Sequence, residues 1–419
     1  MDLTLTPGPR AGSVWAPGSK SMGHRLLICA AFGCGETLLT CRGLSRDLAA
    51  TAACLTALGA RIEGREPNGL LIGPIETVPK GQVELPCGES AATLRFLLPL
   101  AGALGVEARF LREGRLAQRP ISPLTEELAR HGMRIAEEGA VLHCSGRLRS
   151  GEYAISGELS SQFPSGLLLA LPHLEGESSL RVSGTPASSS YLTMTEQVLE
   201  ECGISFQKQG RDYRIPGGQR CAVPPCVTVE GDWSAAAAFL CMGALSPKGV
   251  EVKGLNPASL QGDRMIVPIL RRFGAELRVA ENSVFARAGE RRPLRLDGNQ
   301  TPDLIPVLAA LTACAEGDTV IENAGRLRLK ESDRLRGCAK LIGDLGGRAE
   351  ERKDGLLIRG AGHFRGGCVE SAGDHRIAMA AAVACCGSED CVLLRDAACV
   401  EKSYPDFWRD WECLEVLRI

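Results

Sequence analysis

A repeat of about 70 residues constrains the fold of this chain more than any other feature. Helix-like segments with a long apolar face end in Gly just before a strand-like run. Gly commonly follows the last residue of a helix, so each of these positions predicts a helix end. The segments with the Gly are Cys54–Gly59, Leu124–Gly132, Met194–Gly203, Ile266–Gly274 and Cys338–Gly346. A further copy, Phe407–Leu417, closes the chain without the Gly.

A second class of predicted helix is apolar on every side, which is typical of a buried helix. Short β-like runs bounded by Gly or Pro separate the helices, such as Leu70–Ile72, Val141–His143, Tyr213–Ile215 and Leu356–Ile358. The buried helices begin with a small or acidic residue at the same spacing, near Ser21, Ala92, Ser161, Asp232, Asp303 and Asp374.

Strands that alternate with helices predict an α/β fold. The 419 residues exceed the size at which one hydrophobic core keeps growing, so we expect two lobes of three repeats each. Pro224 and Pro225 interrupt the pattern after the third repeat, and the lobes are expected to meet near Pro224–Gly231.

Composition excludes several classes of function. The formal net charge of −2 gives no general attraction to nucleic acid or to a lipid surface. The first residues do not resemble a secretory signal, and no apolar run is long enough to span a bilayer, so we expect a cytoplasmic protein. The 18 cysteines form no C-x-x-C pair and lie mostly in apolar runs. We interpret them as buried, reduced thiols and expect no metal site.

The starts of the buried helices carry groups that suit anions. A helix N-terminus has a partial positive charge and N–H donors that bind phosphate and carboxylate. Lys20, Ser21 and Arg25 add two cations and a hydroxyl at the first helix start, and Ser160-Ser161-Gln162 adds two hydroxyls and an amide at the third. If the buried helices of a lobe run parallel, the pattern predicts a basic cleft for small anionic substrates.

Acidic residues start the last three buried helices. We interpret Asp232 and, largely, Asp374 as N-caps. Asp303 is different, because Lys330-Glu331-Ser332-Asp333-Arg334 and Lys402 follow it at equivalent repeat positions. Carboxylates among several cations are what a site needs when it both binds anions and moves protons.

Ordered motifs along essentially the whole chain resemble those of the EPSP synthase (3-phosphoshikimate 1-carboxyvinyltransferase) family. The motifs are Pro17-Gly18-Ser19-Lys20-Ser21, Arg119-Pro120-Ile121, Ser160-Ser161-Gln162, Pro302-Asp303, Lys330-Glu331-Ser332-Asp333-Arg334-Leu335, Asp374-His375-Arg376 and Lys402-Ser403-Tyr404-Pro405-Asp406.

The resemblance implies two inside-out α/β barrels, each built of three βαβαββ repeats. It implies an N-terminal lobe, residues 18–229, that binds shikimate 3-phosphate. Residues 1–17 and 230–419 would form a C-terminal lobe on the phosphoenolpyruvate side, which the N-terminal strand crosses back to join.

The implied reaction transfers the enolpyruvyl group of phosphoenolpyruvate to the 5-hydroxyl of shikimate 3-phosphate and releases phosphate. It needs no metal or organic cofactor, and we expect a monomer that binds neither nucleic acid nor membrane. By the same resemblance, Asp303 is the base that takes the hydroxyl proton, and Glu331, with Lys20, is the acid that protonates the methylene carbon.

The remaining site residues are also carried over from the resemblance. Shikimate 3-phosphate would contact Lys20, Ser21, Arg25, Ser160, Ser161, Gln162, Ser188, Asp303, Arg326 and Lys330. Phosphoenolpyruvate would contact Lys20, Ala91, Arg119, Gln162, Arg334, Arg376 and Lys402.

Several positions depart from the usual pattern of the family. His24 and Arg326 stand where Asn is common, and Phe96 replaces a frequent Pro. Ala91 and Ala92 occupy positions that are commonly Gly and Thr, in the loop expected to touch phosphoenolpyruvate. These changes are expected to alter inhibitor fit rather than to abolish activity.

Two alternatives stay open. A UDP-N-acetylglucosamine enolpyruvyl transferase would share the fold and the donor, but it is expected to carry Lys-Asn in place of Lys20-Ser21, together with a reactive loop cysteine. A non-catalytic anion-binding relative would need no carboxylates such as Asp303 and Glu331.

Overall fold

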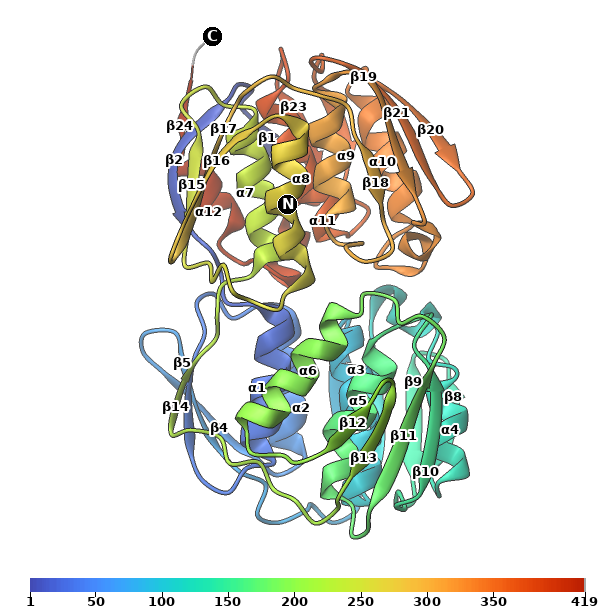
Figure 1. Cartoon of the computed structure of the whole chain (residues 1–419). Helices are drawn as coiled ribbons and strands as arrows, with labels where there is room; N and C mark the ends of the chain where they lie inside the picture. The colour runs from blue at the N-terminus through green and yellow to red at the C-terminus, as the bar shows by residue number, and fades with distance from the viewer. Residues whose placement is uncertain (418–419) are drawn as a thin grey trace. The chain divides into compact units, whose positions relative to one another are not determined.

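The computed structural model describes residues 1–417 and divides the chain into two compact units (Figure 1). The N-terminal unit is Ser19–Val229. The C-terminal unit joins Met1–Gly18 to the residues from Glu230 onward. Each unit has its own continuous hydrophobic core.

One βαβαββ motif recurs in both units. In its second copy the first two strands pair in parallel, and the last strand lies antiparallel between the second and third strands, giving the order β6-β7-β9-β8. Its elements are β6 (Gln82–Gly88), α3 (Ala91–Leu104), β7 (Glu107–Arg112), α4 (Leu124–Arg130), β8 (Arg134–Glu138) and β9 (Val141–Ser145).

The other two sheets of the N-terminal unit have the same order, β10-β11-β13-β12 and β14-β3-β5-β4. The third repeat comprises β10 (Glu152–Ser156), α5 (Gln162–Ala170), β11 (Ser178–Ser183), α6 (Ser190–Glu201), β12 (Gln207–Gln209) and β13 (Asp212–Ile215). The first comprises α1 (Lys20–Ala31), β3 (Thr37–Thr40), α2 (Arg46–Ala57), β4 (Arg61–Arg65) and β5 (Gly69–Gly73). Its missing strand is β14 (Cys226–Thr228), which returns from the end of the unit to pair with β3 in parallel.

The beginning of the chain completes two sheets of the C-terminal unit. β1 (Leu3–Leu5) pairs antiparallel with β23 (Val392–Arg395), and β2 (Arg10–Trp15) pairs in parallel with β15 (Val250–Lys253). The fourth repeat adds α7 (Trp233–Ala244), β15 (Val250–Lys253), α8 (Ile266–Phe273), β16 (Glu276–Ala280) and β17 (Ser283–Arg287). The fifth comprises β18 (Arg295–Asp297), α9 (Ile305–Ala313), β19 (Glu316–Glu322), α10 (Arg334–Asp344), β20 (Arg348–Arg352) and β21 (Gly355–Ala361). The sixth comprises β22 (Gly367–Glu370), α11 (His375–Cys386), β23 (Val392–Arg395) and α12 (Phe407–Glu412).

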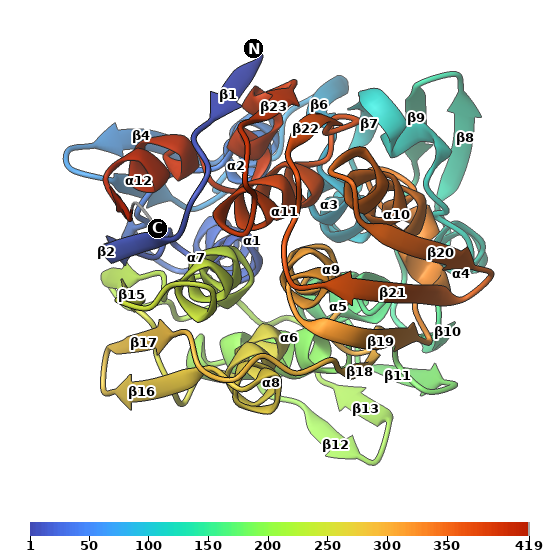
Figure 2. The same cartoon turned by 90° about the horizontal axis from the view of Figure 1, so that it is seen from above.

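The predicted buried helices are confirmed. All residues of α7, α9 and α11 are buried, and the three helices pack together between the sheets of their unit (Figure 2). α1, α3 and α5 are the corresponding helices of the N-terminal unit. Apolar side chains on every face explain this, because such a helix must be covered on all sides. The α/β class with six inside-out repeats is therefore confirmed.

The outer helices end as the Gly pattern predicts. Gly59, Gly132, Gly203, Gly274 and Gly346 follow α2, α4, α6, α8 and α10, and all have positive φ, the region Gly enters at little cost. The sixth copy is shorter than Phe407–Leu417, because α12 ends at Glu412 and β24 (Glu415–Val416) pairs with β2. None of the helices in residues 1–417 is both long enough and apolar enough to cross a membrane.

Candidate active site

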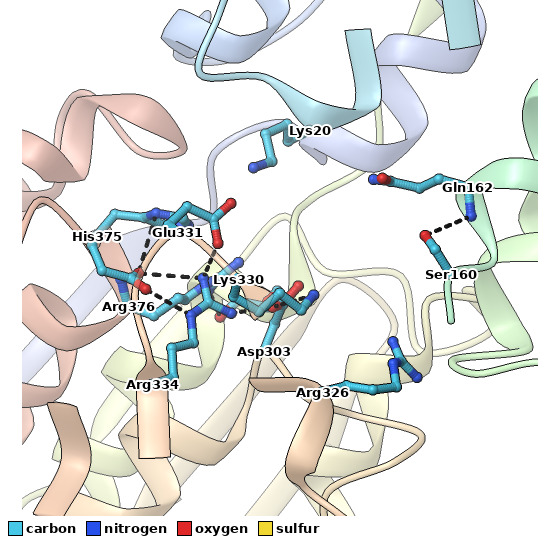
Figure 3. A network of polar contacts seen from close by, with 12 residues as sticks. Lys20, Ser160, Gln162, Asp303, Arg326, Lys330, Glu331, Arg334, His375 and Arg376 are labelled. Atoms are coloured by element: carbon cyan, nitrogen blue, oxygen red, sulfur yellow. Dashed lines mark hydrogen bonds and ion pairs between the residues drawn. The ribbon is translucent and has the colours of Figure 1, made fainter. Parts of the chain in front are cut away.

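Arg334 is the centre of a carboxylate cluster in the C-terminal unit (Figure 3). It is the first residue of α10, which Asp333 caps, and its side chain is only 1% exposed. Its Nε donates to Asp374 Oδ2 at 2.8 Å, its Nη1 to Asp303 Oδ1 at 2.5 Å and its Nη2 to Glu331 Oε2 at 2.9 Å. One buried guanidinium therefore brings together the two carboxylates that the sequence singled out for proton transfer.

Lys330 is the second cation of this cluster. Its Nζ lies 3.4 Å from Asp303 Oδ1. Burial lowers the pKa of Lys330 to about 8, although Asp303 counteracts the shift. Burial would raise the pKa of Asp303, but Lys330, Arg334 and Arg376 together hold it well below its usual value. Asp303 is thus a carboxylate stabilised by three cations, and any anion that neutralises these cations will raise its pKa.

Asp374 caps α11, as the sequence predicts, and it also contacts Arg334. It accepts from the backbone N–H of Arg376 at 2.9 Å, as an N-cap does. Its Oδ2 also accepts from Ser332 Oγ at 2.9 Å and from Arg334, while its Oδ1 accepts a second bond from Arg334. The burial of both charges and the two-point contact fix the plane of the guanidinium. Asp374 therefore orients Arg334 within the cluster.

Arg376 lies in the first turn of α11 and is 3% exposed. Its Nη1 donates to the backbone carbonyl of Ser234 at 2.8 Å, and within residues 1–417 its Nε meets no acceptor. Buried Asp263 is a further acid beside it: burial and the charge of Asp303 raise the pKa of Asp263 to about 7, against the opposing charge of Arg376. A buried guanidinium with an N–H that has no acceptor in the described residues can bind an anionic ligand.

The two other predicted residues of this unit lie in short 3₁₀ segments. Arg326 is in Gly325–Leu329, and its Nη1 donates to Asn299 Oδ1 at 3.2 Å. Its charge also lowers the pKa of Lys330, after the larger effect of burial, so it belongs to the same electrostatic environment. Lys402 is the last residue of Ala397–Lys402 and is buried.

Arg95 organises the corresponding residues of the N-terminal unit. From α3, its Nη1 donates to Gln162 Oε1 at 2.8 Å and to Ser160 Oγ at 3.4 Å, and its Nη2 donates to the carbonyl of Pro120 at 2.6 Å. Ser160 Oγ also accepts from the backbone N–H of Gln162 at 3.2 Å (Figure 3). The Ser160-Ser161-Gln162 motif and the Arg119-Pro120-Ile121 motif thus converge on Arg95, a side chain to which the sequence analysis assigns no role.

Lys20, the first residue of α1, pairs with Asp47 in the first turn of α2, with 2.9 Å between Nζ and Oδ2. Its side chain is 18% exposed and that of Asp47 is 8% exposed. Ser19 caps α1 by accepting from the N–H of Met22. The partly buried pair holds the ammonium group at a helix N-terminus.

Arg25 lies one turn further along α1 and is 2% exposed. Its Nε donates to Thr195 Oγ1 at 2.8 Å, its Nη1 to the carbonyl of Ser21 at 2.6 Å and its Nη2 to the carbonyl of Tyr191 at 2.8 Å. Burial lowers the pKa of Arg25 to about 10. Its guanidinium lies 5.1 Å from the ring centroid of Phe96. Arg25 therefore links α1 to α6 and stays charged at neutral pH.

The remaining predicted residues of this unit lie at element boundaries. Ser161 precedes α5 and is buried, and Ala91 is the first residue of α3. Ser188 is buried with a φ of 52°, in the turn before α6. Arg119 follows the 3₁₀ segment Gly114–Gln118. Ala91 and Ser161 thus lie at the starts of two buried helices, where the sequence predicts such starts.

Comparison with known proteins decides the family. The sequence model of EPSP synthase (3-phosphoshikimate 1-carboxyvinyltransferase) matches residues 6–411. The 3-phosphoshikimate 1-carboxyvinyltransferase of Clostridium kluyveri is 39% identical over 415 residues, which cover 98% of this chain and 97% of the relative. The Clostridium acetobutylicum protein of the same name is 38% identical and covers 97% and 96% of the two chains.

The chain belongs to the EPSP synthase family. The solved structure of EPSP synthase from Acinetobacter baumannii superposes with a TM-score of 0.78 at 26% identity and covers 99% of both chains. The enolpyruvyl transferase NikO from Streptomyces tendae superposes with a TM-score of 0.80 at 19% identity, over 99% of this chain and 98% of its own, and this likeness shows the fold alone. The sequence resemblance to the EPSP synthase family is thus confirmed.

Three side chains of this EPSP synthase family member escaped the sequence analysis: Asp47, Arg95 and Asp263. The repeat could have located Asp47, because Lys20 and Asp47 are 27 residues apart, as are Asp303 and Lys330 in the C-terminal unit. In the N-terminal unit the lysine comes first in the sequence, and in the C-terminal unit the aspartate comes first. Asp263 has no comparable signal, since its role depends on burial beside Arg376. No group of three or more His, Cys, Asp or Glu side chains in residues 1–417 is arranged to hold a metal ion.

Proposed function

We propose that this chain transfers the enolpyruvyl group of phosphoenolpyruvate to the 5-hydroxyl of shikimate 3-phosphate, forming 5-enolpyruvylshikimate 3-phosphate and phosphate. The observation that carries the proposal is that Arg334 binds both Asp303 and Glu331, within a chain that shares 39% identity with a named 3-phosphoshikimate 1-carboxyvinyltransferase. This places the reaction in the shikimate pathway of aromatic amino acid and chorismate biosynthesis.

In the proposed mechanism, Asp303 accepts the proton of the 5-hydroxyl and Glu331, with Lys20, protonates the methylene carbon of phosphoenolpyruvate. The oxygen then bonds to the cationic carbon, and loss of phosphate and a proton from the resulting tetrahedral adduct gives the enol ether. Bound anions offset the charges of Lys330 and Arg334, and this raises the pKa of Asp303 from its low value toward that of a useful base.

We propose that the N-terminal unit binds shikimate 3-phosphate through the predicted hydroxyl, amide and basic groups, which Arg95 and Thr195 hold in place. The C-terminal unit would bind phosphoenolpyruvate through Arg334, Arg376 and Lys402, and Lys330 and Arg326 would contact the shikimate ring substituents. The spare Nε–H of Arg376 supports this assignment.

Phosphate release tests the function directly. The purified chain is expected to release phosphate from phosphoenolpyruvate with shikimate 3-phosphate and not with UDP-N-acetylglucosamine. Release with only the nucleotide sugar would favour the alternative enolpyruvyl transferase, and no release with either acceptor would indicate a non-catalytic relative. A cytoplasmic monomer is part of the proposal. The 18 cysteines of the described residues are reduced thiols, which is typical of a reducing compartment, and sedimentation tests the monomer.

A further inference from the structure

A buried chain of hydrogen bonds joins three helices of the N-terminal unit. His24 Nδ1 on α1 lies 2.7 Å from Thr51 Oγ1 on α2, which lies 2.6 Å from Thr93 Oγ1 on α3. Thr93 Oγ1 donates to Ser90 Oγ, the N-cap of α3, at 2.7 Å. All four residues are at most 1% exposed. None of them was assigned a role in the reaction.

The proton count fixes the direction of this chain. A hydroxyl has one proton, and Thr93 donates its proton to Ser90 Oγ. Thr51 therefore donates to Thr93, because Thr93 has no second proton for the Thr51 contact. Thr51 then accepts from His24, whose Nδ1 must carry hydrogen. The Nδ1–H of His24 thus orients the Thr51 hydroxyl.

The chain runs beside a residue of the proposed site. Asp47, which pairs with Lys20, lies one turn before Thr51 on α2, and His24 lies one turn after Lys20 on α1. The two helices are thus joined by two successive polar contacts. Thr93 Oγ1 is also 3.4 Å from the backbone carbonyl of Asp47, so the α3 start and the Lys20 contact belong to one network.

Phe96 adds a second contact at the same place. Its ring lies edge-on to His24, with 6.3 Å between the ring centroids, and its face lies under the Arg25 guanidinium. His24 and Phe96 are two of the positions at which this chain departs from the usual pattern of the family. The structure shows that these two departures are neighbours.

We propose that His24 is a positioning residue that fixes the first turn of α3, acting through Thr51, Thr93 and Ser90. This inference rests on the proposed function, because Ala91 in that turn is expected to touch phosphoenolpyruvate. The donor at His24 Nδ1 holds Ser90 and the adjoining Ala91 against α1, where Lys20 and Arg25 lie. Loss of that donor misplaces the phosphoenolpyruvate contacts and leaves the shikimate 3-phosphate groups around Arg95 in place.

Four variants and a control test this role. Thr51→Val keeps the shape of the side chain and breaks the chain at its middle, His24→Leu removes the donor, and His24→Asn retains an N–H at the same branch point. The variant that combines Thr51→Val with His24→Leu completes a double-mutant cycle. Thr56→Val is the matched control, since Thr56 is an exposed residue of α2 whose hydroxyl donates to the carbonyl of Ala52 on the same helix.

Small misplacements of reacting groups cost up to about 100-fold in rate, so Thr51→Val and His24→Leu are expected to lower kcat/KM for phosphoenolpyruvate by about 10- to 100-fold. The KM for shikimate 3-phosphate should stay within about twofold, and His24→Asn should recover most of the loss. The combined variant should be no worse than the worse single variant, because one break already interrupts the chain. Three results would overturn the proposal. They are equal losses of kcat/KM in His24→Leu and His24→Asn, a loss in the combined variant equal to the product of the two single losses, and equal changes in the KM values for phosphoenolpyruvate and shikimate 3-phosphate.

Hydrogen exchange in the free protein separates this inference from the function itself. Thr51→Val should speed exchange of the peptide containing the Thr93 amide, which Ser90 Oγ protects, and Thr56→Val should not. If exchange of this peptide is unchanged in Thr51→Val, the proposed role of the hydrogen-bond chain is refuted, even when the enzyme is active. If the parent protein releases no phosphate and Thr51→Val still exchanges faster than the parent, the hydrogen-bond chain is supported and the proposed function is refuted.

Discussion

Arg334 donates two hydrogen bonds to Asp374, and neither side chain is more than 1% exposed. Removing one partner of a buried ion pair leaves an uncompensated charge and costs about 3–5 kcal/mol. Asp303 and Glu331 also contact Arg334, so they offset part of that loss. The pair therefore supports both the stability of the C-terminal unit and the geometry of the proposed site.

Asp374→Asn should lower the free energy of unfolding by about 2–4 kcal/mol, because Asn still caps α11 but carries no charge for Arg334. Chemical denaturation measures the change. Asp232→Asn is the matched control, since Asp232 caps α7 by accepting from the N–H of Ala235 and Asn preserves that bond. Similar losses in both variants would show that the ion pair with Arg334 contributes nothing specific.

Asp303→Asn and Glu331→Gln should each lower kcat by at least about 100-fold, the usual effect of removing a positioned base or acid. Both replacements keep the size of the side chain, so the fold is expected to survive. Glu350→Gln, an exposed position on β20, is a control for a carboxylate outside the cluster. Rapid quench measures the chemical step, and near-normal turnover in both site variants would overturn the assigned roles.

Lys330 predicts an alkaline limb in the pH profile. Burial lowers its pKa to about 8, so the free enzyme loses this cation as the pH rises through 8. Because kcat/KM reports the ionisation of the free enzyme, its value for shikimate 3-phosphate should fall above pH 8. Lys330→Arg should move the fall to higher pH, since guanidinium remains charged. An alkaline limb that is the same in both proteins would assign it to another group.

The repeat made the fold predictable, whereas the site was predictable only in part. Asp303 and Glu331 stand near helix starts, where the periodicity draws attention to them. Arg95 lies inside a helix, and nothing local distinguishes it from a solvated Arg. Its role appears only when α3 and the Ser160 segment pack together, which is a contact between residues 65 positions apart. Asp263 likewise becomes unusual only through burial, which a sequence position cannot report.

The position of Ala91 predicts reduced sensitivity to glyphosate, which the family resemblance implies occupies the phosphoenolpyruvate site. Ala91 is the first residue of α3, is 5% exposed and follows the Ser90 cap. The family resemblance implies Gly at this position. A methyl group misplaced in a tight pocket costs on the order of 1–3 kcal/mol, or about 10- to 100-fold in affinity. Glyphosate is longer than phosphoenolpyruvate toward its phosphonate, so the inhibitor should lose more than the substrate.

Ala91→Gly should therefore restore inhibition by glyphosate, with a KM for phosphoenolpyruvate that is equal or lower. Ala92→Gly is the matched control, because it loosens the same helix start and leaves the methyl of Ala91 in place. Steady-state inhibition against phosphoenolpyruvate measures both. If the parent enzyme is already inhibited at micromolar glyphosate, or if Ala91→Gly and Ala92→Gly change inhibition equally, the methyl of Ala91 does not set the selectivity, and the length of the inhibitor must be accommodated elsewhere.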